Sequence, residues 1–282
     1  MTQRMFRLDL RYDGTDFCGW QIQKDQRSVE GVLLTAIHTI LGDGPTLHVA
    51  GRTDAGVHAE HQVAQFAVDT RLTCEELCRA INSSLPPDVV VTAVREVPEN
   101  WNARRDARRR TYRYSILNTP QRDPLLRRTT YWVSQPLNSE AMSDAAQVFV
   151  GEHDFSAFRS LHCDATNPVR RITGVTLLRD GDRIDFWIEG HAFLRHMVRT
   201  MAGTLIEVGR GKMQPGDVRS ILEGCDRSAA GPTAPAHGLT LVRITYAGEE
   251  SPMESMRLNG KLNPAWLVHL TNREESGHTK SA

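Results

Sequence analysis

The sequence predicts an α+β protein in which two ferredoxin-like halves form a mixed, mainly antiparallel central sheet flanked by helices. Apolar residues at every second position mark the strands, and apolar residues at every third or fourth position mark the helices. The resulting order of elements, βαββαβ, occurs twice along the chain. Because the halves have no obvious sequence identity, the prediction depends on element order. We expect a cleft between the halves.

The first half, residues 1–105, opens with a strand in which charged residues alternate with apolar ones. Its first helix has Ser28 as N-cap and ends at Gly42, and its second helix begins with a possible capping box of Thr73 and Glu76. The predicted elements are a strand at 6–12, a helix at 28–42, strands near 47–51 and 62–68, a helix at 73–85 and a strand at 89–97.

The second half, residues 106–248, repeats this order with two added elements. The predicted elements are a strand at 110–117, an added strand near 130, a helix at 139–150, strands near 171–179 and 183–189, a helix at 193–208, an added helix near 216–223 and a strand at 239–246. Residues 249–282 contain few apolar residues and no sustained period, so we predict a flexible tail there.

The composition of the 282 residues is that of a globular protein without a membrane span. No apolar run approaches the roughly 20 residues that cross a bilayer, and the first residues lack a signal-peptide core. The five cysteines are odd in number and scattered, which argues against a disulfide framework. We therefore expect a cytoplasmic protein.

The formal net charge of the chain is zero, but basic charge is concentrated in one stretch. Residues 101–128 contain nine arginines against two aspartates, with Trp101, Tyr112 and Tyr114 among them. Guanidinium groups bind phosphate, and both guanidinium groups and aromatic rings stack on bases. This combination is typical of a nucleic-acid-binding surface, and a solvated charged face is the alternative.

The connection between the strands near 47–51 and 62–68 is a candidate functional loop. Its length of about ten residues exceeds the roughly two to five that are typical of hairpins. Gly51 and Gly56 allow the backbone to turn tightly and to present Asp54 to a ligand. On residue types alone, a purely structural turn explains the loop equally well.

Two alternative functions have some support in the sequence. Residues 58–60 match the His-x-Glu element of zinc nucleobase deaminases, and Cys74 and Cys78 follow. The match is incomplete, because no proline precedes the first cysteine and three residues separate the pair instead of two. The second alternative is a non-catalytic RNA-binding module, in which the arginine-rich stretch binds RNA and Asp54 is structural.

The chain resembles the tRNA pseudouridine synthase A family over nearly its whole length, to about residue 248. The most specific segment is Gly51-Arg52-Thr53-Asp54-Ala55-Gly56-Val57-His58-Ala59, and residues 12–23, 107–114, 191–199 and 233–241 also match in order and spacing. Glu30 stands where the family commonly has glutamine, and Thr240 stands where an aromatic residue is common. The segment after Glu249 has no counterpart in the family.

The resemblance implies an enzyme that converts uridine to pseudouridine at nucleotides 38, 39 and 40 of the tRNA anticodon stem-loop. It implies a homodimer that needs neither a cofactor nor a metal, with its active-site cleft between the halves. It also implies that Asp54 is the catalytic carboxylate, that Tyr112 packs against the target base, and that Arg52 and Arg199 bind substrate near the carboxylate.

These residue types suit the reaction, which breaks the N1–C1′ bond of uridine and rejoins the base through C5. A carboxylate in a dry pocket tends to take up a proton, and a guanidinium nearby opposes this. Arg52 and Arg199 either hold Asp54 ionised or grip phosphate. Attack on C6, attack on C1′ and elimination at C2′ are all open to such a carboxylate. We interpret four histidines as structural or phosphate-contacting: His58, His191, His196 and His237.

Overall fold

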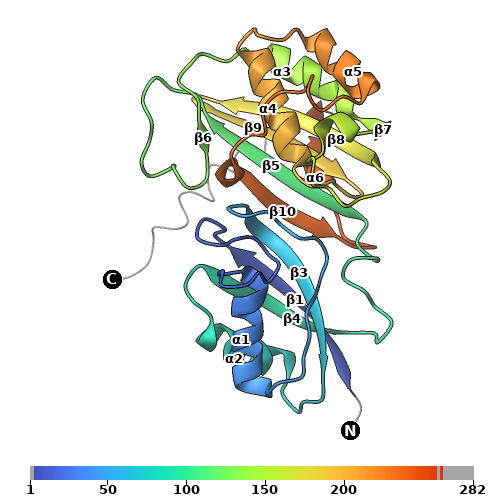
Figure 1. The fold of residues 1–282 in the computed structure, drawn as a ribbon. Coiled ribbons are helices and arrows are strands. Elements are labelled where there is room, and N and C mark those ends of the chain that lie inside the picture. The colour runs from blue at the N-terminus through green and yellow to red at the C-terminus, as the bar shows by residue number, and fades with distance from the viewer. Residues whose placement is uncertain (1–2, 259–260, 263–282) are drawn as a thin grey trace.

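The first half contains the predicted elements in the predicted order (Figure 1). The computed structural model describes residues 3–258 and 261–262. The elements of this half are β1 (Arg4–Tyr12), α1 (Val29–Leu41), β2 (His48–Val49), β3 (His58–Val68), α2 (Cys74–Ser84) and β4 (Val89–Val97). The side chain of Ser28 accepts a hydrogen bond from the Gly31 amide, and Thr73 and Glu76 form the capping box, so both predicted helix starts are confirmed.

Strand β3 begins earlier than the sequence predicted, at His58 instead of near residue 62. Ala59 pairs with Tyr12 of β1, and His58 pairs with Thr240, which lies more than 180 residues later in the chain. The strand is extended by partners far away in sequence, which local periodicity does not reveal. The loop that follows β2 therefore spans residues 50–57 and is shorter than expected.

The second half departs from the prediction where residues adopt a left-handed backbone. Its elements are β5 (Arg109–Leu117), β6 (Tyr131–Trp132), α3 (Ser139–Ala146), β7 (Gly151–Asp154), β8 (Val169–Asp180), β9 (Arg183–Gly190), α4 (Met197–Gly209), α5 (Pro215–Gly224) and β10 (Leu239–Thr245). The predicted helix at 139–150 ends early, and Gly151, with φ +118°, starts the unpredicted β7. The predicted helix at 193–208 starts only at Met197, because His196 has φ +63°.

A single ten-stranded sheet runs through both halves, which lie end to end in Figure 1. Its order is β4-β1-β3-β10-β5-β9-β8-β7, with β2 paired to β3 and β6 paired to β5. Strand β10 joins the halves, since it runs parallel to β3 and antiparallel to β5. The prediction of a mixed, mainly antiparallel sheet flanked by helices is therefore confirmed, and the ferredoxin-like description of each half stays a prediction.

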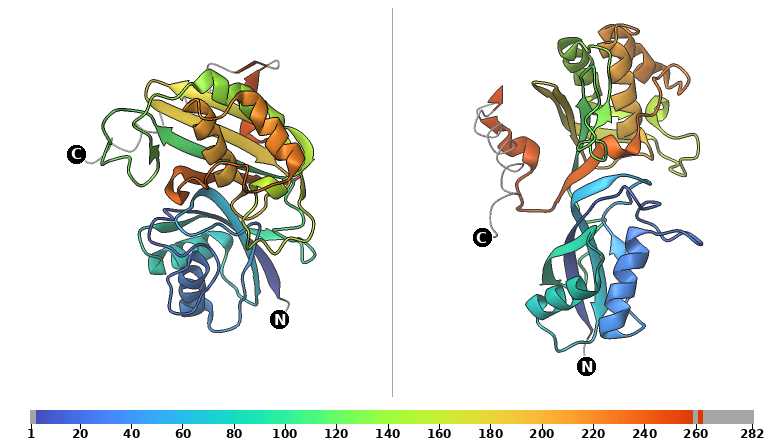
Figure 2. Two further views of the ribbon diagram at one scale, coloured as in Figure 1. Left: turned by 45° about the horizontal axis from the view of Figure 1, so that its top comes forward. Right: turned by 90° about the vertical axis from the view of Figure 1, so that its left-hand side faces the viewer.

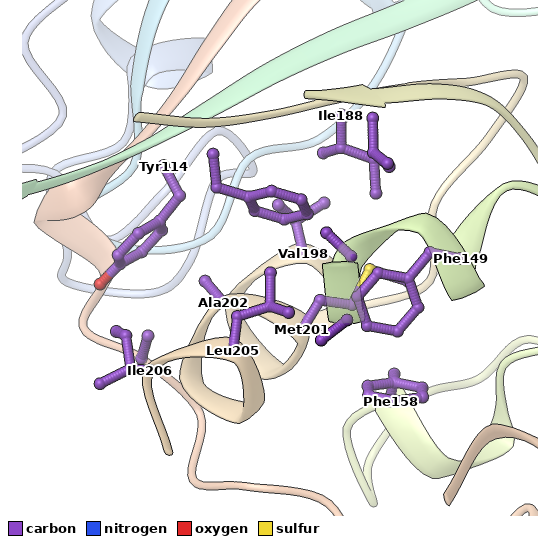
Figure 3. Close-up of a cluster of buried hydrophobic side chains, with 14 of the residues drawn as sticks. Tyr114, Phe149, Phe158, Ile188, Val198, Met201, Ala202, Leu205 and Ile206 are labelled. Carbon is purple, nitrogen blue, oxygen red and sulfur yellow. The ribbon is translucent and has the colours of Figure 1, made fainter. Parts of the chain in front are cut away.

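Each half has its own hydrophobic core between the sheet and its helices. In the second half, Figure 3 shows Met201 and Leu205 of α4 among Ile188, Phe149 and other apolar side chains. Burial of one such side chain contributes about 1.5–3 kcal/mol. Every residue of α4 is buried except one, Arg199. The helix is therefore a core element whose first turn alone reaches the surface of a cavity.

The prediction of a flexible tail from residue 249 is wrong for its first residues. Helix α6 (Pro252–Ser255) lies on the face of the sheet opposite α3, α4 and α5, as Figure 2 shows. Met253 and Met256 are buried there against Trp187, and this apolar contact orders the segment. The chain continues into β11 (Arg257–Leu258) and β12 (Lys261–Leu262). The rest of the predicted tail, 259–260 and 263–282, lies outside the described residues.

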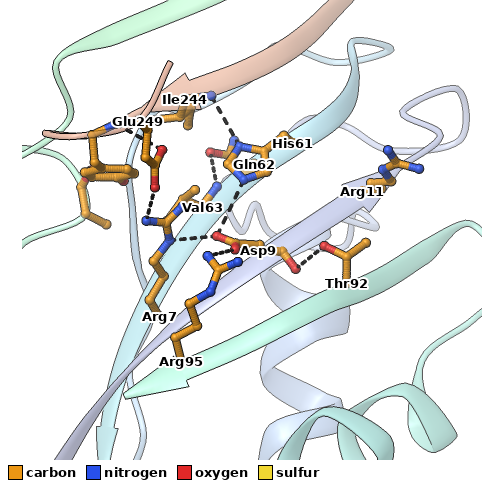
Figure 4. A network of polar contacts seen from close by, with 12 residues as sticks. Arg7, Asp9, Arg11, His61, Gln62, Val63, Thr92, Arg95, Ile244 and Glu249 are labelled. Carbon is orange, nitrogen blue, oxygen red and sulfur yellow. Dashed lines mark hydrogen bonds and ion pairs between the residues drawn. The ribbon is translucent and has the colours of Figure 1, made fainter. Parts of the chain in front are cut away.

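A network of polar side chains around the buried Asp9 joins four strands near the boundary between the halves (Figure 4). Asp9 of β1 is 3% exposed and accepts hydrogen bonds from Arg7, at 2.7 Å, and from Arg95 of β4, at 2.5 Å. Nε2 of His61 in β3 lies 3.6 Å from the same carboxylate, and its Nδ1 accepts a hydrogen bond from the Ile244 amide of β10. This hydrogen bond requires His61 to be neutral, because the accepting nitrogen carries no proton.

We expect the wild-type protein to lose stability on acidification more steeply than His61→Gln. Burial lowers the pKa of His61 to about 4, whereas histidine in an unfolded chain titrates near about 6.5. Between these values the unfolded state binds the extra proton, so the free energy of unfolding falls as the pH falls, by roughly 1–3 kcal/mol. Denaturant unfolding at pH 7 and pH 4.5 measures this. His48→Gln, which replaces an exposed histidine, should keep the wild-type slope; identical slopes in all three proteins would contradict the prediction.

Candidate active site

A cavity of about 1210 Å³ lies between the halves and is lined by segments of both. The first half contributes residues 47–55, and the second half contributes residues 192–199 together with Tyr112 of β5. Arg104 and Arg105, from the connection between the halves, also line it. The cavity lies where the sequence predicted a cleft.

The loop that carries Asp54 is held against the segment that follows β1. The Trp20 amide donates a hydrogen bond to the Thr53 carbonyl at 3.1 Å, and the hydroxyl groups of Tyr12 and Thr53 are 2.8 Å apart. Gly19 has φ +110°, and a Cβ atom there would lie 2.7 Å from the Thr53 carbonyl oxygen. Only glycine permits this close approach, which fixes the backbone on which Asp54 stands.

The carboxylate of Asp54 faces the start of α4. Arg199 Nη1 lies 3.3 Å from Asp54 Oδ2, although the two residues are 145 positions apart. Arg199 is itself fixed, because its Nε donates to the Ala234 carbonyl at 2.9 Å and the Ala234 amide donates to the Arg199 carbonyl. A guanidinium held in this position pairs with the Asp54 carboxylate and limits its movement.

Two aromatic rings form one wall of the cavity. Tyr112 packs edge-to-face against Phe193, with ring centroids 5.1 Å apart. Burial raises the pKa of Tyr112 well above its usual value, so its hydroxyl stays protonated at neutral pH. Tyr114, by contrast, is fully buried and donates to the Pro235 carbonyl. The strand therefore uses one tyrosine for the cavity and the other for the core.

Arg52 lines the same cavity but does not contact Asp54. Its side chain is exposed, and within the part of the chain that the structure describes it has no hydrogen-bond or ion-pair partner. The structure thus brings Asp54, Tyr112, Arg52 and Arg199 to one cavity, and of the two arginines only Arg199 reaches the carboxylate.

The arginine-rich stretch 101–128 does not form one surface. Arg104 and Arg105 are exposed at the cavity rim. Arg109 instead forms ion pairs with Glu189 and Glu254, and Arg113 pairs with Glu60. Consecutive strand residues point to opposite faces of the sheet, so one basic run serves several environments.

His196 belongs to the site, although the sequence suggested only a structural or phosphate-contacting role. Its Nε2 lies 3.6 Å from Asp54 Oδ2. Burial lowers the pKa of His196, against the opposing effect of the Asp54 carboxylate, so the imidazole is neutral at neutral pH. The i, i+3 spacing of His196 and Arg199 at a helix start is the signal that could have revealed it.

The residues of the deaminase alternative do not come together. The ring nitrogens of His58 contact the Gly14 amide and the Arg128 carbonyl, and Cys78 contacts the Val91 carbonyl. Among residues 3–258 and 261–262, no three His, Cys, Asp or Glu side chains are grouped so that they could hold a metal ion. None of the helices in this same part of the chain is long and apolar enough to cross a membrane.

Comparison with known proteins identifies the family of this chain. A family model described as tRNA pseudouridine synthase matches residues 10–106 and 145–247. The tRNA pseudouridine synthase A of Pelobacter propionicus is 42% identical over 243 residues, which are 86% of this chain and 100% of that protein. The Myxococcus xanthus protein of the same name is 44% identical over 241 residues, covering 85% of this chain and 91% of its own.

These matches define the class of the protein as RNA-modifying isomerases. The residues matched by the family model include the loop of Asp54 and the start of α4. The chain belongs to the tRNA pseudouridine synthase A family. It is therefore an enzyme that acts on tRNA and isomerises uridine. A chain of the solved Cbf5–Nop10–Gar1 complex is 12% identical, with a TM-score of 0.31 over 71% of this chain and 54% of that one, which is too low to inform the fold.

Proposed function

We propose that this protein converts uridine to pseudouridine at nucleotides 38, 39 and 40 of the tRNA anticodon stem-loop, with Asp54 as catalytic carboxylate. The observation that carries the proposal is the Asp54 carboxylate beside Arg199 in a cavity lined by both halves. A partly enclosed carboxylate with a fixed cationic neighbour is a frequent arrangement at catalytic sites.

The reaction moves one base from one bond to another. The N1–C1′ bond breaks, the C5–C1′ bond forms, N1 gains a proton and C5 loses one, so no oxidant or group donor is consumed. Attack on C6, attack on C1′ and deprotonation at C2′ each start from an ionised carboxylate beside the sugar and the base. The ion pair with Arg199 fixes where the Asp54 carboxylate lies in the cavity.

The aromatic wall suits the detached uracil. A base stacked on Tyr112 gains about 1–3 kcal/mol, and Phe193 limits how far the tyrosine ring can move. The protonated hydroxyl of Tyr112 can hydrogen-bond a carbonyl oxygen of uracil while the base turns. We propose that Tyr112 holds the base between bond cleavage and bond formation.

Exposed arginines around the cavity suit the RNA backbone. Arg52, Arg104, Arg105 and Arg195 all line it and are exposed. Their guanidinium groups can hold phosphates on either side of a nucleotide that is turned out of its stack. We propose that Arg52 binds the RNA backbone, since it is free of Asp54, and that Arg199 acts on the carboxylate.

The proposal includes a cytoplasmic homodimer without cofactor or metal. Isomerisation as written above needs no added group, and the resemblance to the family supports a homodimer. The five cysteines are free thiols, as expected in a reducing compartment.

The test is to incubate the purified protein with an unmodified tRNA transcript that has uridine at positions 38, 39 and 40. We expect pseudouridine at these positions by chemical mapping, and none where cytidine replaces uridine. A tRNA that is bound but recovered without pseudouridine would favour the non-catalytic RNA-binding module. Pseudouridine elsewhere in the tRNA would overturn the assignment of the anticodon stem-loop.

A further inference from the structure

Arg110 has an unusual set of partners for an arginine at the edge of a nucleic-acid site. Its guanidinium donates only to main-chain carbonyl groups: Nη2 to Ala50 and Arg104, at 3.0 Å each, and Nη1 to His191 at 2.6 Å and Ala107 at 3.3 Å. In the described part of the chain, no carboxylate forms an ion pair with it. Burial lowers the pKa of Arg110, and the four carbonyl groups supply the hydrogen bonds that a buried guanidinium needs.

The acceptors come from three segments that frame the cavity. Ala50 is the first residue of the loop that carries Asp54, and its amide donates a hydrogen bond to the Val63 carbonyl of β3. Residues 104–107 form the connection between the halves. His191 directly follows β9 and begins the segment that leads to Arg199. One side chain thus links the backbone behind Asp54 to the backbone in front of Arg199.

We propose that Arg110 is a positioning residue, whose guanidinium ties the Asp54 loop to the approach of α4 and so holds the Asp54 carboxylate in its place beside Arg199. The inference rests on the proposed function and deepens it by naming a residue that acts on the geometry of the carboxylate. Carbonyl acceptors suit this role, because bonds to them fix the main chain itself.

The planar guanidinium is required by this arrangement. Its donors point outward in a fixed plane and can reach three separate segments at once. A lysine ammonium is a single point with three donors on a flexible stem, so it can reach some of these carbonyls but not all. A lysine at position 110 keeps the positive charge and loses the planar group, so it separates the effect of geometry from the effect of charge.

We expect Arg110→Gln to lower kcat for pseudouridine formation about 100-fold, because a shift of about 1 Å in a reacting group costs roughly that much. The KM for tRNA should stay within about threefold, since the side chain points at protein carbonyls. Amide hydrogen exchange should rise in residues 50–57 and 191–196. Arg110→Lys should lose roughly tenfold in kcat with the same KM.

Arg109→Gln is the matched control. Arg109 precedes Arg110 on β5, points to the other face of the sheet and pairs with Glu189 and Glu254. Both variants remove one positive charge, and the two positions are adjacent in the chain. We expect this variant to keep its kcat and its hydrogen exchange in residues 50–57, with any effect limited to the docking of α6.

An unchanged kcat in folded Arg110→Gln overturns the inference, and so does a raised KM with unchanged kcat, which assigns Arg110 to RNA binding. If the glutamine variant does not fold, the lysine variant is judged by the same criteria. Failure of both to fold overturns the inference in favour of a purely structural role. A wild-type protein without activity would instead overturn the proposed function, so the two failures are distinguishable.

Discussion

Asp54→Asn is expected to lower the rate of pseudouridine formation by about 10⁴-fold or more, as removal of a catalytic carboxylate does in other enzymes. The amide keeps the shape and the contact with Arg199 but cannot act as base or nucleophile. Binding of the anticodon arm should change less than about fivefold, because RNA affinity depends mainly on phosphate contacts. Single-turnover kinetics and a filter-binding titration measure the two quantities.

The matched control for this variant is Asp164→Asn. Asp164 is exposed and lines the same cavity, so the control makes the same change of charge within the site. Since no ion pair joins it to Arg199 among the described residues, we expect near wild-type turnover. Turnover by Asp54→Asn close to that of the wild type would refute the catalytic role of Asp54. An equal loss of turnover in both variants would point to the charge of the cavity as the cause.

Arg199→Gln should produce the second largest effect, a fall in kcat of about 10²–10³-fold, which is typical for loss of one preorganised charged donor at a reacting centre. The variant loses the cation beside Asp54 and weakens the bond to Ala234. Arg199→Lys should recover only part of the rate, since an ammonium cannot bond both groups in the same geometry. Kinetics at saturating tRNA, from pH 6 to pH 9, measure the effect.

Arg195→Gln is the control for Arg199. Arg195 lies four positions before Arg199 and is exposed. It donates a hydrogen bond to the His162 carbonyl and does not pair with Asp54, so its guanidinium can also bind RNA. We expect this control to weaken tRNA binding and to leave kcat at saturating tRNA unchanged. The opposite pattern, with Arg199→Gln affecting only binding, would show that Arg199 grips phosphate instead of acting on the carboxylate.

Much of the fold follows from local signals in the sequence. The Ser28 cap and the capping box of Thr73 are satisfied within one turn of chain, so residue type is enough to predict them. Prediction was less accurate where a distant partner decides the structure. The α6 segment has little apolar character of its own, yet Met253 and Met256 become buried because β9 presents Trp187 to them.

Some residues of the site could be predicted from the sequence, and others could not. Asp54 stood out because two glycines and a long connection surround it, and Arg199 and Tyr112 stood out through resemblance to a family. Arg110, Phe193 and other contributors looked like parts of a basic run or of a core. Their roles depend on which carbonyls and rings surround them, and those surroundings come from other segments.

The sequence by itself determined the succession of helices and strands and the loop that carries Asp54, because capping, periodicity and turns involve residues only a few positions apart. Only the tertiary structure decided that Arg199 meets Asp54, that Arg52 does not, and that Arg110 ties the two sides of the cavity together. Contacts between residues so far apart depend on β10, which pairs with β3 of the first half and with β5 of the second and so sets the distance between the halves.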